Sequence, residues 1–228
     1  MVKVLRVGKM NYRKCLKLQK MLCEDIKNKR EGDMVVIVEH NPVYTVGIRE
    51  KWYSKEEEEK LLALGAGFER VDRGGLITFH GPGQLVAYPI LDLRNYGINV
   101  RCYVKRLEDT VIDLCRRFSL DARTCEHTGV WVNDMKICAL GIRVSRHVTT
   151  HGLALNCNVD LGWFSHIVPC GIRGKMVTSL TQQLKSEITA EDAYPKFRES
   201  FEKLFSTQIV DTDESETAAI LKRLETHS

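Results

Sequence analysis

Short apolar runs of strand length alternate along this chain with stretches that carry apolar residues every three or four positions. Met34–Val38 is continuously apolar, which is typical of a strand buried on both faces. Residues 12–29 instead place Leu18, Leu22 and Ile26 on one face of a helix. Further strands are expected at 2–7, 68–71, 84–91, 129–132, 135–144 and 148–157, and further helices at 54–64, 100–118 and 190–205. This alternation predicts one α/β domain over residues 1–228.

Local signals mark where some of these elements begin or turn. Ser54 followed by Glu57 is a capping-box pattern, so a helix is expected to begin there. Asn133-Asp134 and Ser145-Arg146 lie where tight hairpin turns are expected. From about residue 211 the chain is polar, and we expect a C-terminal tail to which the pattern assigns no element.

Composition narrows the classes of function. The chain is 43% apolar and 28% charged, and its formal net charge is +4, which is the profile of an ordinary soluble globular protein. No apolar run is long enough to span a bilayer, so we expect no membrane partner. Nucleic-acid binding usually comes with a stronger basic bias, so no nucleic-acid partner is expected. A weaker alternative is that the basic first thirty residues dock an acidic protein or RNA.

Eight cysteines are present, but their spacings are irregular and no CxxC pair occurs, which argues against a zinc ribbon or a thioredoxin-type motif. A single cysteine is most often a small, buried and inert residue. Cys170 differs from the others because it lies between Pro169 and Gly171. That context could expose a thiol beside a backbone N–H, as nucleophilic catalysis on an acyl group requires.

Lys136 follows the Asn133-Asp134 turn and enters an apolar strand. A lysine in such a place is more often a solvated stem than a functional group. The functional alternative needs a partner anion, and a thiolate would serve. An ammonium close to a thiol lowers the pKa of that thiol by roughly one to three units.

Two further segments place glycine or apolar residues beside polar groups. Arg73–Gln84 holds four glycines and a proline, and it matches neither a Walker loop nor a GxGxxG fingerprint. It is either a hairpin turn or a binding loop. His151 precedes an apolar strand that ends at Asn156, and it either lines a pocket or is a core histidine with satisfied hydrogen bonds.

Taken together, these segments carry a recognisable pattern. They are Glu39-His-Asn-Pro-Val-Tyr-Thr-Val-Gly47, Arg73-Gly-Gly-Leu-Ile-Thr-Phe-His-Gly-Pro-Gly-Gln-Leu85, Tyr88-Pro-Ile-Leu-Asp-Leu93, Gly129-Val-Trp-Val132, Lys136-Ile-Cys-Ala-Leu-Gly141, His151-Gly-Leu-Ala-Leu-Asn156, Asp160-Leu-Gly-Trp-Phe164, Ile167-Val-Pro-Cys-Gly171 and Val177-Thr-Ser-Leu180. The sequence resembles the lipoyl(octanoyl) transferase family over roughly Val35 to Leu184, and the animal mitochondrial members more than the bacterial ones.

The resemblance implies a mixed α/β (α+β) domain, with mixed sheets flanked by helices, like that of biotin and lipoate protein ligases. It implies transfer of an octanoyl group from acyl carrier protein to a lysine of lipoyl domains, in 2-oxoacid dehydrogenase E2 subunits and the glycine cleavage H protein. Cys170 would carry the acyl group as a thioester, and Lys136 would lower the pKa of its thiol. No metal or nucleotide cofactor is implied, and the location would be mitochondrial, or cytoplasmic for a bacterial protein.

The residues that the resemblance assigns to the acyl site come from three segments. They are Arg73, Gly74, Gly75, Leu76, Ile77, Thr78, Phe79 and His80 in the first, Ala139, Leu140 and Gly141 in the second, and Gly152, Leu153 and Ala154 in the third.

Two alternatives remain open at this stage. One is an ATP-dependent lipoate or biotin protein ligase of the same fold, which would need no nucleophilic cysteine. The other is a non-catalytic module that binds acidic proteins or RNA through its basic N-terminal face, with salt-sensitive affinity.

Overall fold

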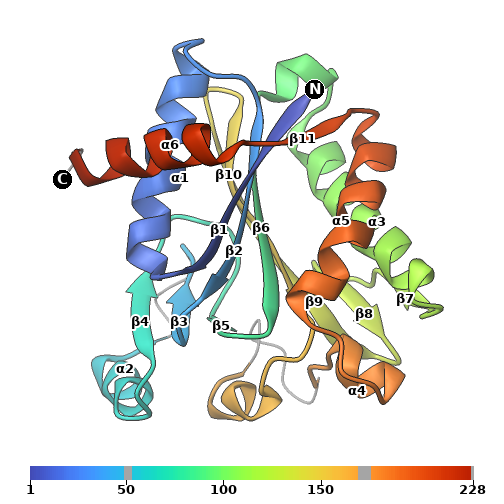
Figure 1. The fold of residues 1–228 in the computed structure, drawn as a ribbon. Coiled ribbons are helices and arrows are strands. Elements are labelled where there is room, and N and C mark those ends of the chain that lie inside the picture. Colours follow the sequence, from blue (N-terminus) through green and yellow to red (C-terminus); the bar gives the residue numbers. More distant parts are fainter. Residues whose placement is uncertain (49–52, 169–175, 227–228) are drawn as a thin grey trace.

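The structure, a computed structural model, describes residues 1–48, 53–168 and 176–226 (Figure 1). A large mixed sheet has the strand order β11-β1-β2-β6-β10-β9-β8-β7, and a small sheet has the order β4-β3-β5. The strands are β1 (Val2–Met10), β2 (Met34–His40), β3 (Val43–Val46), β4 (Gly67–Arg70), β5 (Thr78–His80), β6 (Gln84–Ile90), β7 (Ala122–Arg123), β8 (Val130–Val132), β9 (Met135–Ser145), β10 (Val148–Asn156) and β11 (Ile209–Asp211). In the large sheet β1 runs parallel to β2 and β11, and the other pairs are antiparallel.

Helices cover both faces of the large sheet (Figure 1). The α-helices are α1 (Tyr12–Lys27), α2 (Lys55–Leu62), α3 (Val100–Arg117), α4 (Leu180–Leu184), α5 (Ala190–Phe205) and α6 (Glu214–Thr226), and two 3-10 helices are η2 (Leu93–Tyr96) and η3 (Leu161–His166). α3 and α5 pack on one face, and α1 with α6 packs on the other. The expected mixed α/β fold with sheets flanked by helices is therefore confirmed.

Strand β2 shows why its sequence is continuously apolar. Val35 and Ile37 face the core under α3 and α5, whereas Val36 and Val38 face the core under α1. Side chains alternate between the two faces of a strand, so a strand covered on both sides needs apolar residues at every position.

The expected helix starts and turns are largely observed. Ser54 and Glu57 form the capping box of α2. Asn133 and Asp134 both adopt positive φ, as a two-residue hairpin turn requires. The second hairpin turn lies one residue later than expected, because Arg146 and His147 are its positive-φ pair.

The C-terminal segment departs from the expectation of a tail without an element. It forms β11, which pairs with β1, and then α6, which packs on α1. Ile220 and Leu224 are the buried residues of α6, and Arg223 forms an ion pair with Asp25 of α1. With few of its residues facing the core, this helix has a weak apolar pattern.

The small sheet holds an aromatic cluster of its own. Tyr44 of β3 and Phe79 of β5 pack with Trp163 of η3, and the Phe79 and Trp163 rings stack with centroids 5.0 Å apart. This cluster supports the glycine-rich segment that connects β4 to β5, beside the cavity described below. None of the helices in the described parts of the chain has the length and apolar character to cross a membrane.

Candidate functional site

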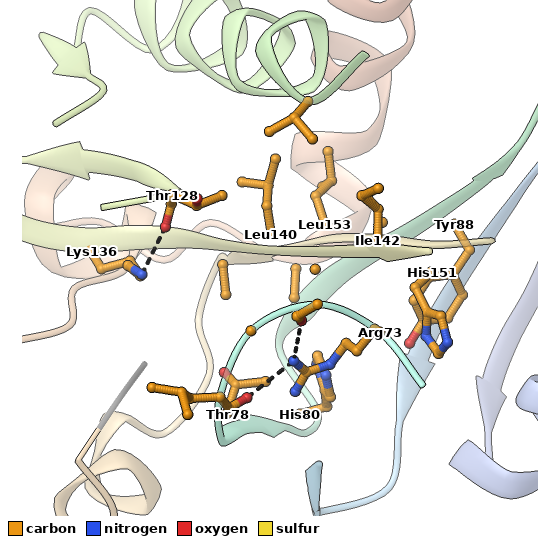
Figure 2. A pocket seen from close by; sticks show the side chains of 18 of the residues that line it. Arg73, Thr78, His80, Tyr88, Thr128, Lys136, Leu140, Ile142, His151 and Leu153 are labelled. Atoms are coloured by element: carbon orange, nitrogen blue, oxygen red, sulfur yellow. Dashed lines mark hydrogen bonds between the residues drawn. The ribbon is translucent and has the colours of Figure 1, made fainter. Parts of the chain in front are cut away.

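A cavity of about 460 Å³ lies between the β9–β10 hairpin and the loop that follows β4 (Figure 2). This volume lies within the range of small-molecule sites. Its wall is formed by Tyr12, Arg73, Gly74, Gly75, Leu76, Thr78, His80, Tyr88, Val104, Glu126, His127, Thr128, Lys136, Ala139, Leu140, Gly141, Ile142, His151, Gly152, Leu153 and Ala154. The three segments expected to form an acyl site therefore meet around one cavity.

Two of the expected residues do not line it. Ile77 and Phe79 are fully buried in the aromatic cluster of the small sheet, whereas Thr78 and His80 face the cavity. Alternation along residues 77–80, the last three of which form β5, explains the split, because successive side chains of an extended chain point to opposite faces. In this structure Ile77 and Phe79 pack behind the cavity wall, so they do not line the cavity as the sequence predicted.

The loop after β4 is held from within by the Arg73 side chain. Its guanidinium donates to the carbonyl oxygens of Gly74 and Leu76, at 2.9 and 3.1 Å, and to the carbonyl and hydroxyl oxygens of Thr45, both at 2.8 Å. A Cβ atom on Gly141 would lie 2.9 Å from both Arg73 Cδ and the Gly74 carbonyl oxygen. Glycine at position 141 therefore allows the loop to approach β9. The Arg73–Gln84 segment is a cavity wall as well as a turn.

Lys136 is buried, with 5% of its surface exposed. The expectation that its side chain extends into solvent is therefore wrong. Its Nζ donates to the Thr128 carbonyl oxygen at 3.0 Å and lies 4.8 Å from the centre of the Trp131 ring. Glu108 contributes a carboxylate nearby, and burial raises the pKa of that carboxyl while the Lys136 charge opposes the rise. A carbonyl oxygen, an aromatic face and a carboxylate thus lie around the Lys136 Nζ.

Cys170 lies outside the described residues, but the segment that follows it returns to Lys136. The Lys136 N–H donates to the Met176 carbonyl oxygen, and the Thr178 N–H donates to the Lys136 carbonyl oxygen, both at 2.9 Å. Lys136 thus pairs in parallel with Val177, seven residues after Cys170. Seven residues span at most about 25 Å when fully extended. Lys136 and Cys170 are 34 positions apart in sequence, but the pairing of Lys136 with Val177 limits the distance between them.

A hydrogen-bond chain connects this segment to His80. Asn156 Nδ2 donates to the Thr178 carbonyl oxygen at 2.8 Å, and Gln84 Nε2 donates to Asn156 Oδ1 at 2.9 Å. Gln84 Oε1 must then accept from His80 Nδ1, 3.2 Å away. Burial lowers the pKa of His80 well below its usual value, so the ring is neutral at neutral pH and its Nε2 is an acceptor.

Tyr12, Tyr88 and His40 extend the buried polar wall, and sequence reasoning assigned them no role. Tyr88 donates its hydroxyl to His40 Nε2 at 2.8 Å, and His40 Nδ1 donates to the Met10 carbonyl oxygen at 2.9 Å. Burial lowers the pKa of His40 to about 4 and raises that of Tyr12 to about 12, so both groups are neutral at neutral pH. These residues come from α1, β2 and β6, and only the fold brings them together.

His151 is buried, but it is not the satisfied core histidine that was one of two expectations. Its Nε2 donates to Asp72 Oδ1 at 3.2 Å, and its backbone N–H donates to Gln19 Oε1 at 2.7 Å. Within the described chain, its Nδ1 and the Nε2 of Gln19 have no hydrogen-bond partner. Burial, followed by the charges of Arg73 and Arg143, lowers the pKa of His151 to about 3, so Nδ1 is an uncharged acceptor.

Metal-ligating side chains do not gather at this site. Over the residues that the structure describes, no group of three or more His, Cys, Asp and Glu side chains is arranged to hold a metal ion.

Comparison with known proteins identifies the family. The sequence profile of the lipoyl protein ligase A/B catalytic domain matches residues 11–202. The chain belongs to this family. Members of the lipoyl protein ligase A/B family with similar sequences include mitochondrial octanoyl-[acyl-carrier-protein]:protein N-octanoyltransferases of Danio rerio, at 49% identity over 90% of this chain and 92% of the relative, and of Homo sapiens, at 41% over 93% and 96%. An octanoyltransferase of Flavobacterium johnsoniae is 42% identical over 90% of this chain and 96% of its own length.

Solved structures support the fold at much lower sequence identity. A lipoate-protein ligase A bound with ATP has a TM-score of 0.74 at 15% identity, covering 97% of this chain and 93% of the ligase. The biotin protein ligase of Aquifex aeolicus has a TM-score of 0.56 at 11% identity, covering 90% and 70%. At such identities the likeness shows the fold alone, whereas the octanoyltransferase relatives at 41–49% identity support acyl transfer as the reaction class.

Proposed function

We propose that this protein transfers an octanoyl group from octanoyl-acyl carrier protein to a lysine of a lipoyl domain, through a thioester on Cys170. The observation that carries the proposal is the buried Lys136 at one end of the cavity, paired in its backbone with the segment that follows Cys170. The names of the octanoyltransferase relatives support the reaction class.

In the first step the Cys170 thiolate attacks the carbonyl carbon of the octanoyl thioester. A new carbon–sulfur bond forms to Cys170, the bond to the carrier sulfur breaks, and the Lys136 ammonium gives a proton to the departing thiolate. The products are the octanoyl-enzyme, the carrier thiol and a neutral Lys136 amine. A buried ammonium suits this role because a low dielectric strengthens its effect on a nearby thiol.

In the second step the neutral amine of the acceptor lysine attacks the octanoyl-enzyme. A carbon–nitrogen bond forms, the carbon–sulfur bond to Cys170 breaks, and the neutral Lys136 takes the proton that the amine loses. The thiolate and the ammonium are thereby restored together, so protons balance over one cycle.

The partners follow from this chemistry. The donor is octanoyl-acyl carrier protein, and the proposed acceptors are lipoyl domains of 2-oxoacid dehydrogenase E2 subunits and the glycine cleavage H protein. The animal relatives are named mitochondrial, which supports a mitochondrial location for this protein. A bacterial relative has a similar sequence identity, so a cytoplasmic location is the alternative if the protein is bacterial.

Intact-mass measurement tests the acyl-enzyme. After incubation with octanoyl-acyl carrier protein, the protein should gain one octanoyl group that hydroxylamine removes. Cys170→Ala should gain none, whereas Cys125→Ala, a variant of an exposed cysteine, should behave as wild type. An adduct that persists in Cys170→Ala would refute Cys170 as the nucleophile.

A second measurement separates transferase from ligase chemistry. Lipoyl domain is mixed with the protein and either octanoyl-acyl carrier protein or free octanoate plus ATP. The proposal expects modification with the carrier only, because a thioester already supplies the activated acyl group. Modification with ATP and free octanoate alone would establish the ligase alternative instead.

A further inference from the structure

Three residues from three elements meet at the end of the cavity farthest from Lys136, and of these His151 lines the cavity. Asp72 comes from the loop after β4, Arg143 from β9 and His151 from β10. The Asp72 carboxylate forms an ion pair with Arg143 through one oxygen, and its other oxygen accepts from His151 Nε2 at 3.2 Å. One carboxylate thus ties the loop to both strands of the hairpin, and we call these three residues the clasp.

The clasp lies where the loop after β4 packs against β9. Next to Asp72, the Gly74 N–H donates to the Ile142 carbonyl oxygen at 3.0 Å. Ile142 and His151 are paired across the β9–β10 hairpin, and both line the cavity. Figure 2 shows Lys136 and His151 at opposite ends of the cavity. The clasp is therefore placed to close the end opposite the reactive lysine.

His151 depends on this contact for its position. Its φ of +58° lies in the left-handed region, which is unfavourable for a residue other than glycine and persists only where surrounding contacts hold it. Its side chain is 98% buried, and Nδ1 has no partner within the described chain, so the hydrogen bond to Asp72 fixes the ring. The Asp72–Arg143 pair is far more exposed, at 41% and 46% of the side chains, so its own attraction is weak.

Distances along the strand indicate what the clasp would exclude. From Lys136 to Ile142 β9 advances six residues, or roughly 20 Å at about 3.3 Å per residue. An octanoyl chain has seven carbon–carbon bonds of about 1.5 Å, so its length is below about 11 Å. A hexadecanoyl chain has fifteen and reaches up to about 22 Å. From an attachment beside Lys136, only the longer chain would reach Ile142 and His151.

We propose that Asp72 is a positioning residue that limits acyl length, because it fastens His151 and the loop across the far end of the cavity. The inference rests on the proposed octanoyl transfer. Without the carboxylate, the His151 ring and the Gly74 backbone lose a shared anchor. The closed end then opens to chains much longer than eight carbons.

The test compares octanoyl- and hexadecanoyl-acyl carrier protein as donors, with a lipoyl domain as acceptor and product measured by intact mass. In Asp72→Ala the ratio of hexadecanoyl to octanoyl kcat/KM should rise at least about tenfold, equivalent to about 1.4 kcal/mol of discrimination. Asp72→Glu should restore most of the wild-type ratio. Asp72→Asn should give an intermediate ratio, because it keeps an acceptor for His151 but loses the charge that faces Arg143.

Asp211→Asn is a matched control. Its carboxylate pairs with Arg198 at 2.6 Å and accepts from the Tyr194 hydroxyl at 2.8 Å, and 45% of its side chain is exposed. It lies on β11, an edge strand of the large sheet that four strands separate from β9. Its chain-length ratio should equal that of wild type.

The outcomes separate the two proposals. If wild type transfers octanoyl and folded Asp72→Ala keeps the wild-type ratio, or loses activity equally with both donors, the clasp inference is wrong. If Asp72→Ala does not fold, Asp72→Asn and Arg143→Gln decide, and unchanged ratios in both would refute it. If wild type transfers neither acyl group, the proposed function itself fails.

Discussion

Replacing Lys136 with methionine tests the centre of the proposed mechanism. Methionine keeps a long, flexible, apolar side chain against the Trp131 ring but removes the charge. Two unit charges 4 Å apart attract by roughly 4 kcal/mol at an effective dielectric constant of about 20, which corresponds to about three pKa units. Because Lys136 is buried, we expect the pKa of the Cys170 thiol to rise by about one to three units in Lys136→Met.

The kinetic consequence follows from the fraction of thiolate and from the lost proton donor. If the thiol pKa rises by one to three units to its free value of about 8.5, the thiolate fraction at pH 7 falls by roughly eightfold to thirtyfold. Acylation by octanoyl-acyl carrier protein should slow by at least that factor. Stability should also fall, because the Thr128 carbonyl oxygen loses its donor and the Glu108 carboxylate loses a nearby opposite charge, so the thiol pKa is compared in folded protein only.

The assay follows the pH dependence of Cys170 alkylation by iodoacetamide. Exposed Cys102 and Cys125 would obscure it, so both are replaced by serine in every variant. Lys27→Met is the matched control, because Lys27 is also largely buried, with 8% of its side chain exposed, and is paired with Glu24. A thiol pKa in Lys136→Met equal to that of the control would refute Lys136 as the activating group.

Three further predictions concern the cavity, the buried histidines and the C-terminal helix. Gly141→Ala should lower kcat/KM for octanoyl transfer at least about tenfold with the fold retained, because its Cβ would meet Arg73 at 2.9 Å; unchanged steady-state kinetics would contradict this. Burial lowers the folded pKa of His40 to about 4, below the unfolded value of about 6.5, so the unfolded chain binds more protons and stability falls as pH drops between these values. In urea unfolding, His40→Gln should therefore lose about 2 kcal/mol less than wild type between about pH 7 and pH 5, and an equal loss would refute the assignment. Leu224→Ala should lower the free energy of unfolding by about 2 to 3 kcal/mol, because its side chain is buried against α1, and a thermal melt unchanged from wild type would show that α6 does not stabilise the fold.

Much of the fold could be predicted because local pattern and tertiary burial agree. β2 is apolar at every position because helices cover both of its faces, and α2 begins at its capping box. The helix α6 could not be found in the same way. Only Ile220 and Leu224 of that helix are buried, so its sequence resembles a solvated segment.

The site was only partly predictable, since several of its features exist only in three dimensions. The sequence assigned contiguous motif residues together, but the two-residue alternation of the extended chain at 77–80 points Ile77 and Phe79 away from the cavity. Lys136 has the local pattern of an edge lysine, and its burial comes from the 126–128 segment and from the strand pairing with Val177. His151 pairs with Asp72, which lies 79 positions away in sequence.

The pairing of β1 with β11 has a consequence for how this chain is made. Val2 lies opposite Ile209, so β1 leaves the ribosome about two hundred residues before β11, the strand that pairs with its outer edge. Until then one edge of β1 has unpaired N–H and C=O groups, which can template pairing with another chain. Contacts between residues this far apart in sequence also slow folding. We therefore expect nascent chains that end before residue 209 to aggregate unless a chaperone covers that edge.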